Sequence, residues 1–435
     1  MSNYDDFLPK AQERRKIPYD EEPIFRQKSR ANKQPVVVKS STWLKLTVGL
    51  LGVLSVVFVV LFGVLFSRSN KTATISGHYG TQYSEHVVVS RGEITDTAVN
   101  IALHSAVMVE AHDRETIGNH KYGAGSGVII SDTGDEVIIV TNYHVCMNVY
   151  DKKTVAPYIY VLLYDYINVD NSVYESRRIR CSYVGGSYNE DVAVIKFART
   201  GAAEALYEAS GAMPVTIGDS SAVYFAENIF AIGNPSGKGI SVTKGVVSRP
   251  IAWSTVDVNG DNINEVVRSI QIDAAINSGN SGGGLFDPNG NWIGIVSSKV
   301  STLENTSYAV PSNEAYGVAW NIIRNNGVLK VAAPQFKTEI ESRVVTNSDG
   351  AISYVYDTVA TSSAYGVVAG DVLESIRYVN PDKGTITVDL HKPYALEEQM
   401  LYLVPGDTII INVKRGSSIV AVEITISTGH ISVRN

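Results

Sequence analysis

Cysteine is scarce in this sequence of 435 residues, which contains only Cys146 and Cys181. Two cysteines at this spacing do not make a metal-ligand set, so we expect no metal site. Their pairing stays open at this point. Outside the cytoplasm a disulfide between them is permitted, and two separate buried thiols that act as small apolar side chains account for them equally well.

Charge is also modest, because acidic and basic residues make up 19% of the chain and the net charge is −7. Proteins that bind nucleic acid usually carry an excess of Lys and Arg. We therefore expect no nucleic-acid partner. The length is sufficient for two or three domains.

Charge is absent altogether from residues 46–66, which read LTVGLLGVLSVVFVVLFGVLF. A helix of this length reaches about 31 Å and can cross a hydrocarbon core of about 30 Å. A cleaved signal peptide would have a shorter apolar core that ends at small residues, whereas residues 67–71 offer no clear Ala-x-Ala site. We therefore predict an uncleaved transmembrane helix.

The charges on either side of this run predict its orientation. Six basic residues without an acidic residue among them lead up to it: Arg26, Lys28, Arg30, Lys33, Lys39 and Lys45. Only Arg68 and Lys71 follow closely, so the positive-inside rule places the N-terminus in the cytoplasm and the rest outside. Residues 1–45 lack hydrophobic periodicity and are predicted to be a disordered cytoplasmic tail, and residues 67–94 a linker.

The most informative pattern is the turn-forming stretch 277–283, in which Ser281 follows Gly279 and Asn280 and precedes two glycines. Such a turn lets the backbone approach a substrate carbonyl, and the amides of Gly279 and Ser281 can point into one small space. His144 ends an earlier apolar run, and Asp191 opens another. The order His, Asp, Ser is that of the chymotrypsin-type acyl-transfer triad.

Further short motifs accompany these residues in a fixed order. They are Gly125–Ile130, Thr141–Val145, Asp191–Lys196, Ile217–Ser220, Ala231–Pro235, Thr243–Ser248 and Gln271–Asn277. The series resembles the HtrA/DegP-type trypsin-like serine proteases and covers residues 95–330. Two departures are visible, because Ser278 and Gly284 stand where this family usually has prolines. Both departures predict a less rigid catalytic turn.

Short β-branched runs separated by turn residues predict many strands and little helix before residue 300. The predicted strands are Gly127–Ile130, Val137–Val140, Tyr158–Leu163, Val192–Phe197, Asn228–Ile232, Val242–Ser248, Ser269–Asp273 and Trp292–Ser297. The resemblance implies a mainly β fold, a chymotrypsin-like double barrel of two six-stranded barrels. It places His144 and Asp191 on the first barrel and Ser281 on the second.

The resemblance also implies the site residues and the chemistry. His144 would act as general base, Asp191 would orient it, and Ser281 would be the nucleophile. The amides of Gly279, Ser281 and Asn280 would form the oxyanion hole. The substrate pocket would be bounded by Ala275, Ile276, Ile295, Val296 and Ser297, which predicts cleavage after small or medium aliphatic residues. No metal or organic cofactor is required.

Ser312 is a suitable N-cap for an amphipathic helix that Gly327 would end. Residues 331–345 are predicted to be a linker. Residues 346–435 then resemble a PDZ domain, a small β domain that binds peptide C-termini. Ile352–Val355 would edge the peptide groove, Ala395–Leu403 would be its helix, and Gly350, Ala351 and Ile352 would bind the terminal carboxylate. A small β domain without binding activity is the alternative.

Residues 257–265 imitate the start of a calcium loop. Its sixth position is Asn262 where glycine is required, and Arg268 stands in place of the bidentate Glu. A hairpin turn at Asn259-Gly260 is the simpler interpretation.

These features together predict a membrane-anchored, HtrA-like serine endopeptidase whose catalytic domain lies outside the cytoplasm. Its expected substrates are unfolded or misfolded proteins and peptides, and the family resemblance implies a homotrimer. The alternative is a tethered chaperone or peptide sensor with secondary proteolysis.

Overall fold

The computed structural model describes residues 93–115, 123–148, 150–151, 154–165, 176–237, 239–256, 265–299, 305–346, 352–380 and 384–434. The predicted cytoplasmic tail, transmembrane helix and nearly all of the linker 67–94 lie outside these ranges. Among the helices in the described ranges, none combines the length and apolarity that a membrane span requires.

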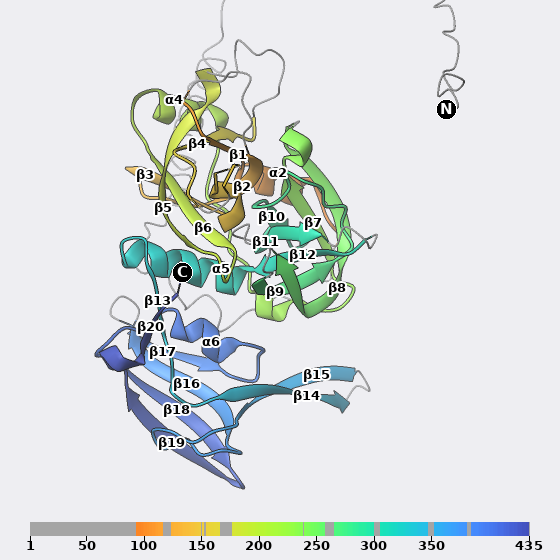
Figure 1. Ribbon diagram of the computed structural model, residues 1–435. Helices are drawn as coiled ribbons and strands as arrows, with labels where there is room; N and C mark the ends of the chain where they lie inside the picture. Colours follow the sequence, from red (N-terminus) through yellow and green to blue (C-terminus); the bar gives the residue numbers. More distant parts are fainter. Residues whose placement is uncertain are drawn as a thin grey trace, which may run out of the picture. The chain divides into compact units, whose positions relative to one another are not determined.

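Six antiparallel strands close the first barrel (Figure 1). In barrel order they are β1 (Ala106–His112), β2 (Gly123–Asp132), β3 (Glu136–Thr141), β6 (Val192–Ala198), β5 (Ile179–Ser187) and β4 (Tyr158–Leu163). Its interior is filled by β-branched side chains such as Val107, Ile129, Ile139 and Ile195, all fully buried. These residues fit a pleated, two-sided buried surface, which is why the segments form strands.

A second closed barrel of six strands follows. In barrel order its strands are β10 (Gly284–Phe286), β11 (Trp292–Lys299), β12 (Ser307–Pro311), β9 (Glu265–Ile272), β8 (Ser241–Val256) and β7 (Asn228–Gly233). The mainly β prediction and the pair of six-stranded barrels are confirmed. Every predicted strand lies within or overlaps an observed one, whereas β1, β10 and β12 were not among the predicted strands.

Helices are few in the barrels and between them. Those whose full bounds fall within the described ranges are the α-helices α2 (Asp96–Leu103), α4 (Gly201–Ser210) and α5 (Ser312–Arg324). The predicted helix is therefore present, but its N-cap is Pro311 rather than Ser312. The Ser312 hydroxyl instead donates to the carbonyl of Gly218 at 2.8 Å, so it anchors the helix to the second barrel. Gly327, with φ +93°, lies just beyond the helix end.

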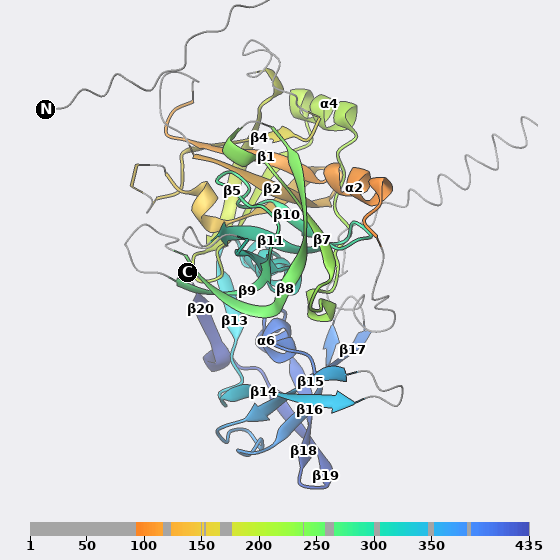
Figure 2. The ribbon, with the colours of Figure 1, turned by 90° about the vertical axis from the view of Figure 1, so that its right-hand side faces the viewer.

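The C-terminal region is a small β domain that includes the α-helix α6 (Ala395–Met400) (Figure 2). Its sheet has the order β14 (Thr338–Thr346), β15 (Ile352–Ala360), β16 (Val372–Asn380), β18 (Thr408–Arg415) and β19 (Ser418–Thr425), with β17 (Gly384–Asp389) also paired to β16. Separately, β13 (Leu329–Ala332) pairs with β20 (Ile431–Arg434).

One expectation for this region needs correction. Residues 331–345 are not a plain linker, because they contain the end of β13 and most of β14. The segment Ile352–Val355 does begin a strand, and β14 pairs with one of its edges. On the other edge β16 pairs with β15 only at Thr358 and Val359, so the expectation that Ile352–Val355 edges a groove stays a prediction. Of the expected carboxylate-binding residues, Gly350 and Ala351 lie outside the described ranges, and Ile352 is the first residue of β15.

The two cysteines are free, buried thiols in the core of the first barrel, so the structure has no disulfide between them. Burial raises the pKa of both thiols, which keeps them protonated. The calcium-like segment joins β8 to β9, which pair antiparallel up to Val256 and Glu265. Residues 257–264 themselves lie outside the described ranges.

Candidate active site

His144 lies in a 3₁₀ helix, Tyr143–Cys146, that directly follows β3. Its Nδ1 is 2.9 Å from Oδ1 and 3.1 Å from Oδ2 of Asp191. The backbone N–H of His144 also donates to Asp191 Oδ1 at 3.3 Å. The imidazole retains 27% of its exposure and the Asp191 side chain none. The contact therefore fixes the Nδ1 edge of the imidazole and leaves the ring partly open to solvent.

Asp191 occupies a tight turn before β6 and has a left-handed backbone, with φ +50°. This conformation is costly for a residue with a side chain and persists only where the surroundings impose it. Asn142 imposes it in part, because its Nδ2 donates to the Asp191 carbonyl at 2.9 Å. The Ser297 hydroxyl donates to Asp191 Oδ2 at 2.7 Å. Both carboxylate oxygens thus receive hydrogen bonds in a buried position.

Ser281 lies on a turn between two glycines in left-handed conformations, Gly279 with φ +97° and Gly282 with φ +86°. A Cβ at Gly282 would lie 2.1 Å from the carbonyl oxygen of Ser126 and 2.2 Å from Oγ1 of Thr141. Only glycine fits there. Ser126 secures the turn from the first barrel, since its N–H donates to the Ser281 carbonyl at 2.8 Å and its hydroxyl to the Gly279 carbonyl at 2.7 Å.

The Ser281 hydroxyl donates to the backbone carbonyl of Ser297 at 2.9 Å. A hydroxyl has one proton to donate, so in this arrangement it does not donate to His144. Ser297 therefore connects both halves of the site, with its carbonyl to Ser281 and its hydroxyl to Asp191. The structure brings the three predicted triad residues to one place where the two barrels meet.

The oxyanion-hole candidates divide into two groups. The N–H of Asn280 donates to the Asn277 carbonyl at 2.9 Å, so it is used within the turn. The amides of Gly279 and Ser281, on either side of it, stay the candidates that can hold a developing oxyanion.

The predicted pocket residues also differ among themselves. Ala275 is exposed, whereas the other four are buried. Ile276 and Val296 share one apolar cluster in the second barrel, and Ile295 belongs to another. Ser297 is the one whose polar contacts reach the triad candidates. Sequence reasoning missed this second role of Ser297, and it also missed Ser126, although the motif Gly125–Ile130 contains it.

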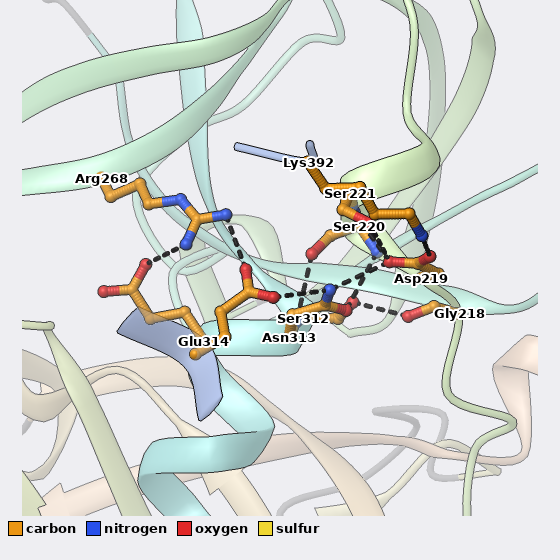
Figure 3. A network of polar contacts seen from close by, with 10 residues as sticks. Gly218, Asp219, Ser220, Ser221, Arg268, Ser312, Asn313, Glu314 and Lys392 are labelled. Atoms are coloured by element: carbon orange, nitrogen blue, oxygen red, sulfur yellow. Dashed lines mark hydrogen bonds and ion pairs between the residues drawn. The ribbon is translucent and has the colours of Figure 1, made fainter. Parts of the chain in front are cut away.

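A polar network extends from the second barrel to the C-terminal domain (Figure 3). Arg268 of β9 contacts Glu398 of α6 at 2.8 Å and Glu314 of α5 at 3.6 Å. Asn313 donates to Glu398 at 3.0 Å and to Asp219 at 2.9 Å. Burial raises the pKa of Glu314 to about 7, although Arg268 opposes the shift.

The same network contains an ion pair and borders a cavity. Lys392 reaches Asp219 at 2.8 Å. Although burial acts in the opposite direction, Lys392 and the neighbouring hydrogen bonds hold the pKa of Asp219 below its usual value. A cavity of about 450 Å³ lies beside Arg268 and Glu314, and Glu190, Tyr394 and Arg434 also line it. It is therefore at the junction with the C-terminal domain rather than at Ser281.

Comparison with known proteins finds similar sequences among serine proteases. Residues 125–295 match the family model of the trypsin-like peptidase domain. A protein named Serine protease HtrA-like from Staphylococcus epidermidis is 29% identical over 337 residues, 74% of this chain and 50% of that protein. Serine protease Do-like HtrA from Lactococcus lactis is 28% identical over 272 residues, 58% of this chain and 60% of that protein. The chain thus spans about half the length of the staphylococcal relative.

Two solved structures also align with most of the chain. The HtrA-type protease AlgW with tripeptide aligns with 78% of this chain and 96% of its own, at 25% identity and a TM-score of 0.44. The serine endoprotease from Yersinia pestis aligns with 76% of this chain and 96% of its own, at 24% identity and a TM-score of 0.40.

Proposed function

The chain belongs to the HtrA-type trypsin-like serine proteases, and on this premise we propose that it hydrolyses peptide bonds through an acyl-enzyme formed on Ser281. The observation that carries the proposal is the contact of His144 with a buried Asp191, linked through Ser297 to the Ser281 hydroxyl. Nucleophilic catalysis by a hydroxyl needs a base within reach and a group that orients the base. These residues supply all three components.

In the proposed reaction the Ser281 hydroxyl first turns from the Ser297 carbonyl toward His144. His144 takes its proton while Oγ attacks the scissile carbonyl, and Asp191 stabilises the imidazolium without accepting the proton. The amides of Gly279 and Ser281 bind the oxyanion. His144 then protonates the leaving amine, and water releases the acyl group by the reverse sequence. The steps use side chains and backbone of this chain alone.

The substrates we propose are unfolded or misfolded proteins, cleaved after small or medium aliphatic residues. The support for this preference is the set Ala275, Ile276 and Val296, which provides no carboxylate to pair with Lys or Arg. Discrimination among aliphatic residues should be low, because one methylene changes binding by only about 1–3 kcal/mol. A peptide library digested by the protein and analysed by mass spectrometry tests the preference. Predominant cleavage after Arg or Lys would contradict it.

We propose that the C-terminal domain is a PDZ domain that receives peptide C-termini by strand addition. In the described residues β16 pairs with β15 only at Thr358 and Val359, so the edge of β15 before Thr358, on the side away from β14, is the edge that we propose accepts a strand. The start of β14 lies near α6, since Thr338 Oγ1 donates to Glu397 at 3.4 Å. Calorimetry with peptides that end in a hydrophobic residue measures the binding.

We also propose that residues 46–66 anchor the protein in the cell membrane with the catalytic domain outside the cytoplasm, and that it forms a homotrimer. The uncharged run and the excess of basic residues before it support the anchor. Protease added to intact spheroplasts should degrade the barrels and spare an N-terminal epitope. Light scattering of the purified protein measures the number of subunits.

A covalent label tests the central proposal. A fluorophosphonate probe should attach to Ser281, as mapped by mass spectrometry, and the same protein should hydrolyse casein. The Ser281→Ala protein should do neither. If Ser281 is not labelled while aggregation of an unfolded protein is suppressed, the chain is instead a tethered chaperone.

A further inference from the structure

Strand β20 runs from the C-terminal domain back to the barrels and pairs antiparallel with β13. Its residue Arg434 faces Leu329 in this register. The Arg434 Nη1 donates to Oε1 of Glu190 at 2.9 Å. Glu190 is the residue immediately before Asp191, so a side chain from the far end of the sequence contacts the turn that carries the carboxylate of the site.

The contact is asymmetric in its burial. The Glu190 side chain retains 7% of its exposure, whereas that of Arg434 retains 48%. The other oxygen of Glu190 accepts a hydrogen bond from the Ser187 hydroxyl. Removal of the exposed partner would thus leave a buried carboxylate with one hydrogen bond. A buried charge that loses its counter-ion is destabilised strongly, and its surroundings rearrange or the carboxylate is protonated.

The neighbouring charges make this loss more severe. Glu314 of α5 and Arg268 of β9 line the same cavity as Glu190 and Arg434. Burial is the main cause of the raised pKa of Glu314; the charge of Glu190 adds to it and that of Arg434 opposes it, so the charges of this cluster act on one another through space. Arg268 is already shared between Glu314 and Glu398. Arg434 therefore supplies the positive charge that Glu190 contacts in this cluster.

The turn next to Glu190 is sensitive to displacement. Asp191 holds a left-handed backbone, and its N–H donates to the Tyr188 carbonyl at 3.3 Å. Its carboxylate must stay within hydrogen-bond distance of both His144 and Ser297. A rotation at Glu190 is transmitted to this carboxylate through one peptide bond.

We propose that Arg434 is a positioning residue for Asp191: it holds Glu190 in place and so keeps the Asp191 carboxylate on His144. The inference rests on the proposed peptidase function. Arg434 does not reach substrate and takes no part in proton transfer. Its action is to reduce the range of orientations available to the Asp191 turn.

The residues at the start of β20 contact the C-terminal domain and the segment that leads into it. The His430 ring packs edge-on against Tyr365, with ring centroids 4.8 Å apart. The backbone carbonyl of His430 accepts a hydrogen bond from the N–H of Ala333 at 2.7 Å. The Ser432 hydroxyl donates to the Val331 carbonyl at 3.2 Å. A displacement of the C-terminal domain would thus reach the Asp191 turn through a strand only a few residues long.

Kinetics of the full chain test the proposal with Arg434→Gln, Arg434→Lys and Ser432→Ala. Ser432→Ala is the matched control, because it weakens β20 without touching Glu190. We expect Arg434→Gln to lower kcat about tenfold with KM changed less than twofold, since misplaced catalytic groups reduce turnover by up to about a hundredfold. Arg434→Lys, which keeps the charge, should recover at least half of kcat. Ser432→Ala should stay within twofold of wild type.

A readout independent of turnover separates this proposal from the proposed function. The Nδ1–H proton of His144, bound to Asp191, should give a downfield NMR signal that broadens in Arg434→Gln and persists in Ser432→Ala. A wild-type protein without hydrolysis contradicts the peptidase function, and the NMR comparison still decides the positioning role. An unchanged signal in Arg434→Gln, or equal kcat losses in Arg434→Gln and Ser432→Ala, would overturn the proposal. If Arg434→Gln does not fold, Glu190→Gln takes its place and should lower kcat about tenfold. A Glu190→Gln protein with the kcat of the wild type would overturn the proposal.

Discussion

The two halves of the candidate site are held in different ways. On one side the Asp191 carboxylate receives hydrogen bonds at both oxygens and lies against His144. On the other side the Ser281 hydroxyl donates to a backbone carbonyl, away from the base. The difference indicates that the electrostatic half is assembled in advance, while the nucleophile needs one side-chain rotation before attack. Such a rotation is fast compared with turnover in most enzymes.

Packing accounts for one of the two departures from the family pattern near Ser281. Gly284, where the family usually has proline, begins β10. A Cβ at this position would lie 2.4 Å from the ring of Phe286, which is fully buried and stacked on Phe230 at 5.2 Å. The aromatic ring thus occupies the space that a proline side chain would need. The chain therefore has glycine, which does not restrict φ, after the Ser281 turn, and the buried Phe286 ring fills the space beside it in the second barrel.

Removal of the nucleophile or the base should have the largest effect. Ser281→Ala and His144→Ala should each lower kcat for casein or a reporter peptide by about a millionfold, because the groups of a triad act as one unit. Circular dichroism should show a folded protein in both cases. Substantial hydrolysis by Ser281→Ala would mean that another residue is the nucleophile.

The second-largest effect should come from Asp191→Asn. We expect kcat to fall about 10⁴-fold, because an amide favours the wrong tautomer of His144. The variant keeps the size of the side chain. Measurement of kcat between pH 6 and 10 separates loss of orientation from loss of charge. A decrease of less than tenfold would show that the pre-assembled half contributes little, contrary to the comparison above.

Ser297→Ala sharpens the comparison further, since it removes the hydroxyl that Asp191 accepts but keeps the carbonyl that Ser281 contacts. We expect about a tenfold decrease in kcat, the size of a lost hydrogen bond to a charged group. Ser254→Ala is the control, because Ser254 is equally buried and pairs with Ser269 elsewhere in the barrel. Equal losses in both variants would assign the effect to packing.

The sequence predicted the barrels well because their strands alternate or continue in β-branched residues bounded by turns. The contacts that join separate strands were harder to foresee. Ser312 reads as an N-cap by local rules, yet its hydroxyl bonds to Gly218, which lies 94 residues away in the sequence. The position of β14 was missed for a related reason: residues 331–345 contain few turn signals, and only the pairing with β15 shows that they belong to the sheet. Long-range partners of this kind depend on topology rather than on local propensity.

The site shows the same limit. His144, Asp191 and Ser281 were singled out from motifs, since each stands in a distinctive local context. The contact of Glu190 with Arg434 joins residues 244 positions apart, and neither has a local pattern that indicates a partner. Ser297 was predicted as a pocket residue from its place on a strand. Its contacts with both halves depend on how the barrels meet, which no single segment encodes.

The smallest effect should come from the charge cluster behind Asp191, where burial raises the pKa of Glu314 to about 7. A carboxyl with a raised folded pKa stabilises the fold when protonated, so its contribution is present below the unfolded value and is lost as pH rises through 7. Glu314→Gln removes this dependence. Between pH 5 and pH 8 the Tm of the variant should therefore gain about 2–4 °C relative to its parent. Both proteins should carry Ser281→Ala to prevent autolysis, and Glu204→Gln on the exposed face of α4 is the control. If the Tm difference between the two proteins is the same at pH 5 and pH 8, the protonation state of Glu314 does not change between these pH values. The charge cluster behind Asp191 would then not titrate between pH 5 and pH 8.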